Sequence, residues 1–157
     1  LSECEANPET PEALQPFILS YEASAMALVA GETFKLSLIG KSFKLFETAI
    51  KKYGAVHYLP EFMRGSVAEN LPWFYFSKRA LAKIDFENII HKEAQNPEYA
   101  SWKIMSFVYW AWAKQHPQRK YRPQALAYLQ KAIELDPHYL AGRKRSEELL
   151  SQFTIDN

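Results

Sequence analysis

The sequence contains one cysteine, Cys4, and only 5 glycines among its 157 residues. A single cysteine excludes an internal disulfide framework and a zinc cluster built on cysteines. So few glycines argue against a β-sandwich or β-barrel, because those folds need many tight turns. No uninterrupted apolar run approaches the ~20 residues of a membrane-spanning helix. The longest, 107–113, has seven residues, so we expect no integral membrane segment.

The composition is that of a folded protein with an uneven distribution of charge. Hydrophobic residues make up 48% and charged residues 24%, which excludes disorder of the whole chain. Residues 1–32 carry six acidic residues and no Lys or Arg, whereas residues 33–157 carry 19 basic residues against 12 acidic ones. The simplest interpretation is a solvated acidic segment that favours the N-terminus of the first helix. A dipolar chain can also pack head to tail, so a homo-oligomer is an alternative.

The hydrophobic periodicity is helical, and no segment has the alternation of a strand. We therefore expect an all-α chain, with a disordered acidic N-terminus over 1–10 and one helical domain over 11–157. The domain is predicted to contain three helical hairpins and a capping helix, at about 11–54, 57–96, 97–137 and 139–153.

The first helix is predicted over 11–30. Thr10 is the expected N-cap, Pro11 suits the first helical position, and Gly31 is the expected end. Its predicted core face is an apolar stripe at helical spacing, made of Leu14, Phe17, Ile18, Tyr21, Ala25, Leu28 and Val29.

Residues 106–139 resemble the tetratricopeptide repeat, a helix-turn-helix unit of ~34 residues. The resemblance rests on aromatic, small and apolar residues at that family's spacing, namely Tyr109, Ala113, Ala125, Leu129, Ala132 and Pro137. Trp112 and His116 depart from the leucine and tyrosine that are usual in the family. Small residues let two helices approach closely, and bulky neighbours fill the gaps between successive pairs. The resemblance implies an α-α superhelix whose concave face binds a protein or peptide.

Weaker matches at 23–56 and about 57–96 lead us to expect three degenerate repeats in all. The segment from Asn70 to Glu87 is also similar to uncharacterised bacterial helical-repeat proteins, which implies no activity. The absent initiator methionine and the scarcity of cysteine favour the bacterial periplasm, cell envelope or export over the cytoplasm. Cys4 follows Leu1-Ser2-Glu3 much as in a lipoprotein processing site, but Glu3 stands where that signal needs a small residue.

No pattern in the sequence is typical of an enzyme. The scattered glycines exclude a phosphate-binding loop, and neither a nucleophile elbow nor a zinc-protease helix is present. Glu87 and His91 share a helix face, but two ligands without a third predict a surface hydrogen bond. The basic clusters at 119–122 and 143–145 do not form the continuous stripe of a nucleic-acid-binding domain. We predict no catalysis, cofactor, metal or nucleic-acid partner.

Aromatic residues, at 15% of the chain, are the strongest remaining signal. In tetratricopeptide repeats the first helix of each pair lines the groove, which here implies that Phe107, Trp110 and Lys114 lie there. Lys144 is expected beside them on the next helix. Rigid aromatic rings with flanking cations suit a peptide groove, because they supply affinity and hold carboxylates. We predict that this groove binds the partner.

A second candidate contact is formed by Trp73, Phe74 and Tyr75, in the irregular segment 72–76. Bulky residues in a loop either fill the core of the protein or meet a partner. We favour core filling, because an insertion between stacked helices leaves space to be filled. Two other functions stay open: binding of a small apolar ligand in an interhelical cavity, and self-association as an assembly subunit.

Overall fold

The computed structural model describes residues 11–155, with side chains as far as Phe153. This part of the chain is helical and contains no strand, so the all-α prediction is confirmed. The predicted disordered segment 1–10, which includes Cys4 and the expected N-cap Thr10, lies outside the described residues. The chain divides into two compact units, the first ending at Asp85 and the second beginning at Phe86. The predicted domain boundaries stay predictions.

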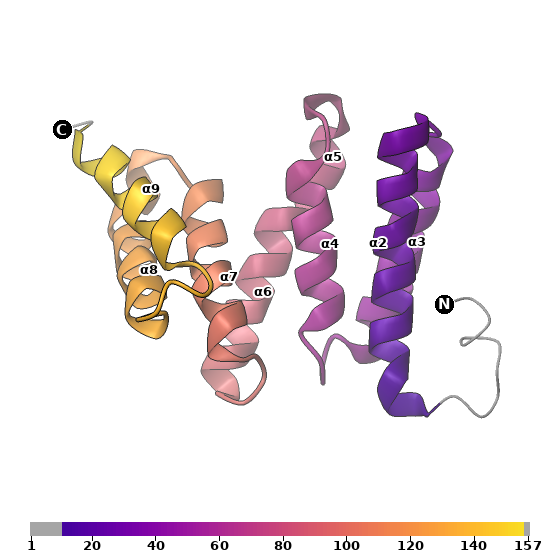
Figure 1. Ribbon diagram of the computed structural model, residues 1–157, viewed down its shortest axis with the longest axis horizontal. Helices are drawn as coiled ribbons and strands as arrows, with labels where there is room; N and C mark the ends of the chain where they lie inside the picture. The colour runs from indigo at the N-terminus through magenta and orange to yellow at the C-terminus, as the bar shows by residue number, and fades with distance from the viewer. Residues whose placement is uncertain (1–10, 156–157) are drawn as a thin grey trace. The chain divides into compact units, whose positions relative to one another are not determined.

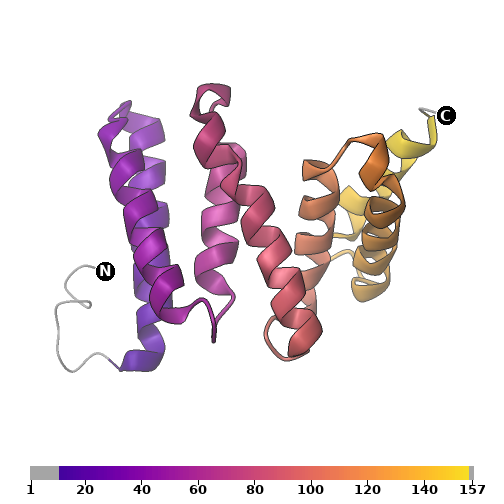
Figure 2. The same ribbon diagram turned by 180° about the vertical axis from the view of Figure 1, so that it is seen from behind.

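Unit 1 consists of three long helices and a short irregular segment. Its elements are η1 (Glu12–Leu14), α2 (Gln15–Thr33), α3 (Ser37–Tyr53), α4 (Leu59–Asn70), η2 (Trp73–Tyr75), α5 (Phe76–Arg79) and the first turn of α6 (Leu81–Gln95). α2, α3 and α4 pack against one another side by side (Figure 1). The turn between α2 and α3 lies at the same end of this unit as η2 and α5 (Figures 1 and 2).

The predicted core face of α2 is wrong apart from Ile18. Leu14, Phe17, Tyr21 and Leu28 of the predicted stripe are exposed. The buried residues of the helix are Pro16, Ile18, Leu19, Ser20, Ala23 and Ala30. Because α2 is apolar on several sides, periodicity alone does not identify its buried face. The small residues decide it, since they allow close approach: buried Ser42 of α3 donates a hydrogen bond to the carbonyl oxygen of Ala23, at 2.7 Å.

α2 also continues past Gly31, where the sequence predicts its end. It runs to Thr33, and its C-cap is Phe34, which adopts the left-handed region with φ 56°. For a bulky residue this conformation costs roughly 1–2 kcal/mol. Phe34 therefore combines backbone strain with a side chain that is 84% exposed.

The segment Glu12–Thr33 is the one helix in the described part of the chain that is long and apolar enough to cross a membrane, by length and composition alone. The longest uninterrupted apolar run in the sequence is short, and on that ground the sequence predicts no membrane segment. Glu12–Thr33 is nevertheless apolar on average, because its few polar residues interrupt the run without making the helix polar. A buried core helix passes the same test, and α2 packs against α3 and α4. A single weakly apolar helix of this kind does not indicate an integral membrane protein.

A buried ion pair joins α4 to the start of α6 within unit 1. Arg64 donates two hydrogen bonds to Asp85, from Nε at 2.9 Å and from a terminal nitrogen at 2.7 Å. Asp85 has no solvent exposure. Burial alone would lower the pKa of Arg64, but the Asp85 hydrogen bonds and the charges of Asp85, Glu47 and Glu61 raise it. Arg64 therefore remains charged in the interior, and its position depends on Asp85.

Unit 2 is built around a pair of antiparallel helices. Its elements are the rest of α6, α7 (Trp102–Gln115), η3 (Arg119–Tyr121), α8 (Arg122–Leu135) and α9 (Arg143–Ile155). The small residues Ala113, Ala125 and Ala132 are fully buried, as close packing of α7 with α8 requires. Helical hairpins of this kind occur in many all-α proteins, so the tetratricopeptide assignment stays a prediction.

Candidate functional site

The predicted groove residues of α7 lie together on one face. The ring centroids of Phe107 and Trp110 are 5.2 Å apart, and Lys114 places its Nζ 5.1 Å from the centroid of Trp110. Both rings are half-buried, and Phe107 also contacts the buried ring of Phe86 on α6. The i, i+3, i+7 spacing of the three residues explains this arrangement, because such positions share one side of an α-helix.

The cation that α9 contributes to this cluster is Arg145, whereas the sequence predicts Lys144 there. The Arg145 guanidinium lies 5.5 Å from the Phe107 ring and 5.1 Å from the Trp110 ring, both within cation–π range. Lys144 is exposed beside it. Leu149 of α9 lines both hollows beside α7 and so identifies the face of α9 that lies toward α7. Arg145 precedes Leu149 by four residues and therefore shares its side of the helix.

The hydroxyl of Ser106 fixes the start of α9 against α7 and α8. It donates a hydrogen bond to the carbonyl oxygen of Ala132 at 2.8 Å and accepts one from the backbone N–H of Gly142 at 3.1 Å. Ser106 and Gly142 are both buried. Arg145 follows Gly142 by three residues, so this contact determines where its guanidinium meets the rings of α7.

The loop before α9 is folded around the buried carboxylate of Asp136. Its oxygens accept hydrogen bonds from the backbone N–H groups of Leu140, Ala141 and Arg143, at 2.7, 2.8 and 3.1 Å. These bonds delay the start of α9 to Arg143, whereas the sequence predicts it near 139. Burial alone would raise the pKa of Asp136, but the three hydrogen bonds and the Arg143 charge lower it below its ordinary value.

Because the pKa of Asp136 is lowered by folding, we expect protonation of Asp136 in acid to reduce the stability of unit 2. Because the pKa is lower in the folded chain than in the unfolded chain, the contribution is present above the unfolded pKa of ~3.9 and disappears as pH falls through the folded value. Urea unfolding of the wild type and of Asp136→Asn, measured between about pH 6 and pH 2.5, tests this. We expect the free energy of unfolding to fall less with acid in the variant than in the wild type. An equal fall in both proteins would contradict the lowered pKa of Asp136.

The opposite face of α7 is anchored by aromatic contacts to α8. Tyr109 and Trp112 each lie 4.9 Å, centroid to centroid, from Tyr128, and Trp112 also stacks on His116 at 4.0 Å. Burial, with the charge of Glu93, raises the pKa of Tyr109 to about 12. These contacts pack α7 against α8 on the side opposite the Phe107 and Trp110 rings.

Two adjoining hollows lie between α7 and α9. One, of ≈ 260 Å³, is lined by Trp110, Lys114, Arg145, Glu148, Leu149 and Gln152. The other, of ≈ 600 Å³, is lined by Ala113, Lys114, Pro117, Arg119, Arg122, Leu149, Gln152 and Phe153. They share three residues, and we call the combined surface the α7–α9 groove.

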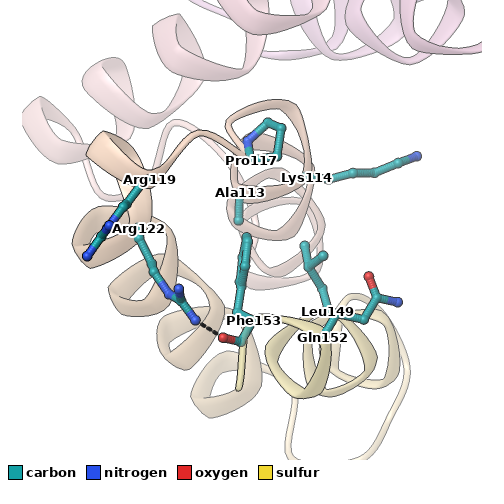
Figure 3. Close-up of a pocket in the computed structure, with 8 residues that line it drawn as sticks. All are labelled: Ala113, Lys114, Pro117, Arg119, Arg122, Leu149, Gln152 and Phe153. Atoms are coloured by element: carbon teal, nitrogen blue, oxygen red, sulfur yellow. Dashed lines mark hydrogen bonds between the residues drawn. The ribbon is translucent and has the colours of Figure 1, made fainter. Parts of the chain in front are cut away.

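The larger hollow has a cationic wall and an apolar floor. Figure 3 shows the Phe153 ring extending from α9 toward Ala113, with Arg119 and Arg122 on one side and Leu149 on the other. Arg122 donates a hydrogen bond to the carbonyl oxygen of Phe153 and so caps the last turn of α9. Arg119 and Arg122, which belong to the first of the two basic clusters in the sequence, therefore form this wall. Among the described residues that line the larger hollow, none is acidic.

The second candidate contact lies in unit 1, and it does not fill the core. Trp73 is 81% exposed, Phe74 is 50% exposed and Phe76 is 77% exposed, so the prediction of core filling is wrong for these side chains. Tyr75 is half-buried and lines a separate apolar hollow. The short helices η2 and α5 take up the extra residues at the surface, so no interior space is left to be filled.

Glu87 and His91 are both exposed on α6. The described part of the chain contains no group of three or more His, Cys, Asp or Glu side chains placed to hold a metal ion. No protein-family model, curated protein or solved structure matches this chain.

Proposed function

We propose that unit 2 binds an acidic peptide segment of a partner protein in the α7–α9 groove, without catalysis. The observation that carries this proposal is the cluster of Phe107, Trp110, Lys114 and Arg145. The two rings lie 5.2 Å apart, Lys114 lies 5.1 Å from the Trp110 ring, and Arg145 lies 5.5 and 5.1 Å from the Phe107 and Trp110 rings. Aromatic and arginine side chains dominate the binding energy of protein interfaces.

The charges of the groove favour an acidic peptide. Lys114, Arg119, Arg122 and Arg145 line the two hollows, whereas Glu148 is the acidic residue among their described lining residues. A carboxylate of the peptide would accept charge-assisted hydrogen bonds from Arg145 or Lys114. An apolar side chain of the same peptide would occupy the larger hollow beside Phe153 and Leu149, where it loses contact with water.

The helices that line the groove are held in place by contacts within unit 2 that need no peptide. The Ser106 contacts fix the start of α9, and the aromatic contacts to Tyr128 hold α7. Binding to such a surface loses little side-chain entropy. The tetratricopeptide resemblance supports the same interpretation, because it implies that the first helix of the hairpin lines a peptide groove.

The test begins with a peptide probe selected from a random dodecapeptide library displayed on phage, using the whole chain as bait. We expect the selected sequences to be rich in Asp and Glu and to contain an apolar residue. In fluorescence anisotropy with one such labelled peptide, Trp110→Ala and Arg145→Ala should each weaken binding by roughly 30-fold or more, the size of an interface hot spot.

Trp102→Ala is the matched control, because Trp102 is an exposed tryptophan on the same helix but outside the groove. It should leave the affinity unchanged, and urea unfolding should show that Trp110→Ala remains folded. If Trp110→Ala unfolds the protein, Trp110 is a core residue and the proposed register is wrong. If the affinity falls equally in Trp102→Ala, or if the selected peptides are basic, the groove is not the binding site.

A further inference from the structure

The end of unit 1 carries exposed aromatic side chains that its own packing does not use. They come from two loops, the α2–α3 turn and the η2–α5 segment, which lie at the same end of the unit (Figure 1). We call this surface the aromatic tip; it consists of Phe34, Leu36, Trp73, Phe74 and Phe76. Three of these side chains, Phe34, Trp73 and Phe76, are 84%, 81% and 77% exposed. Such a cluster marks an interaction site rather than ordinary surface.

An apolar hollow of ≈ 350 Å³ lies between the two loops. Leu28, Gly31 and Leu36 line it from one side, and Leu71, Pro72 and Tyr75 line it from the other, so the two loops face each other across it. Its size is in the range of pockets that hold small ligands. Because its lining is largely apolar, a hydrocarbon chain is a suitable occupant.

The two segments that form the tip carry basic residues in excess of acidic ones. The segment 33–46 carries Lys35, Lys41 and Lys44 and no acidic residue. The segment 70–84 carries Lys78, Arg79 and Lys83 and no acidic residue. Glu32 and Glu69 immediately precede the two segments and Glu47 and Asp85 immediately follow them, so six cations stand against four flanking acids. Asp85 is buried and paired with Arg64, whereas Glu32 lines the apolar hollow. Exposed aromatic residues surrounded by cations match the interface of an anionic bilayer.

We infer that the aromatic tip binds the surface of an anionic phospholipid bilayer. Phe34, Trp73 and Phe76 insert at the level of the headgroups, where the amphipathic indole ring is most stable. Lys35 and Lys41 attract the lipid phosphates and carboxylates, and a lipid acyl chain fills the hollow beside Leu36 and Tyr75. The protein then lies on the membrane and does not span it. A second copy of this chain fits less well, because two such tips would bring like charges together.

Flotation of the whole chain with vesicles tests the inference. The wild type should bind vesicles of phosphatidylcholine and phosphatidylserine, with weaker binding at higher salt and little binding to phosphatidylcholine alone. The triple variant Phe34→Ser, Trp73→Ser and Phe76→Ser should lose at least about tenfold in partition, because it removes the inserted apolar surface. Val56→Ser is the matched control, since Val56 is an equally exposed apolar residue of unit 1 outside the tip, in the loop between α3 and α4.

A second pair of variants tests the cations. Lys35→Glu with Lys41→Glu should weaken binding at least about tenfold, since each basic residue near an anionic surface contributes measurably to the attraction. Lys51→Glu with Lys52→Glu, at the far end of α3, should have a much smaller effect. Failure of the wild type to float, or equal binding to neutral vesicles, would overturn the inference. So would a dimer in light scattering that the triple tip variant abolishes.

Discussion

Asp85→Asn is expected to destabilise unit 1 by about 3–5 kcal/mol, the usual effect of leaving a buried charge without its partner. The variant keeps the shape of the side chain but removes the carboxylate that accepts two hydrogen bonds from Arg64. Glu47 and Glu61 also raise the pKa of Arg64 through their charges, after the contribution of Asp85. Since a domain is stable by only about 5–15 kcal/mol, this loss should shift the urea midpoint strongly.

Two comparisons separate this effect from a general sensitivity to mutation. The double variant Arg64→Met with Asp85→Leu should recover most of the loss, because it removes both charges together. Glu147→Gln breaks the part-exposed ion pair with Arg143, whose atoms lie 2.8 Å apart, and should cost under about 1 kcal/mol. A loss below about 1 kcal/mol for Asp85→Asn would show that solvent reaches Arg64 in the folded chain.

Gly142→Ala is the second large effect, because there is no room for a side chain at this position. A Cβ on Gly142 would overlap the carbonyl oxygen of Ser106 and lie 2.7 Å from its Oγ. To remove this overlap, α9 must move away from α7, which breaks the hydrogen bond between Gly142 and Ser106. Overpacking of this kind costs typically 1–3 kcal/mol and more where backbone atoms collide. The same shift should displace Arg145 and weaken peptide binding.

Gly40→Ala is the matched control for the effect of removing a glycine. A Cβ at Gly40 meets no other atom within 4 Å, and the residue lies inside α3. The substitution should therefore stabilise the protein by roughly 0.5–1 kcal/mol. Thermal unfolding of both variants measures the contrast. If Gly142→Ala were as stable as the wild type, the position assigned to α9 would be incorrect.

Local sequence signals were sufficient to predict the helical class and several helix ends. The prolines after Leu71 and Asp136 follow the ends of α4 and α8, because residues before proline avoid the helical region. The cluster of Phe107, Trp110 and Lys114 also follows from spacing on one helix. Each of these predictions depends only on neighbours along the chain.

Features that depend on distant neighbours were not predictable in the same way. Periodicity favours the Leu14–Leu28 stripe of α2 as its core face, but the small residue Ala23 faces Ser42 of α3 instead. The start of α9 depends on the hydrogen bonds that buried Asp136 accepts. Which basic residue of α9 lies over the Trp110 ring depends on how that helix is rotated about its axis. The exposure of Trp73 depends on how η2 and α5 fold, which no local pattern indicates.

The indole N–H signals of the four tryptophans provide the most direct test of the proposed groove. In a ¹⁵N-labelled sample they can be assigned with single Trp→Phe variants and followed while the selected acidic peptide is added. The Trp110 signal should shift most, while the Trp73 signal in unit 1 should stay in place. A shift confined to Trp73 or Trp102, with Trp110 unchanged at saturating peptide, would contradict the proposal that the α7–α9 groove is the binding site.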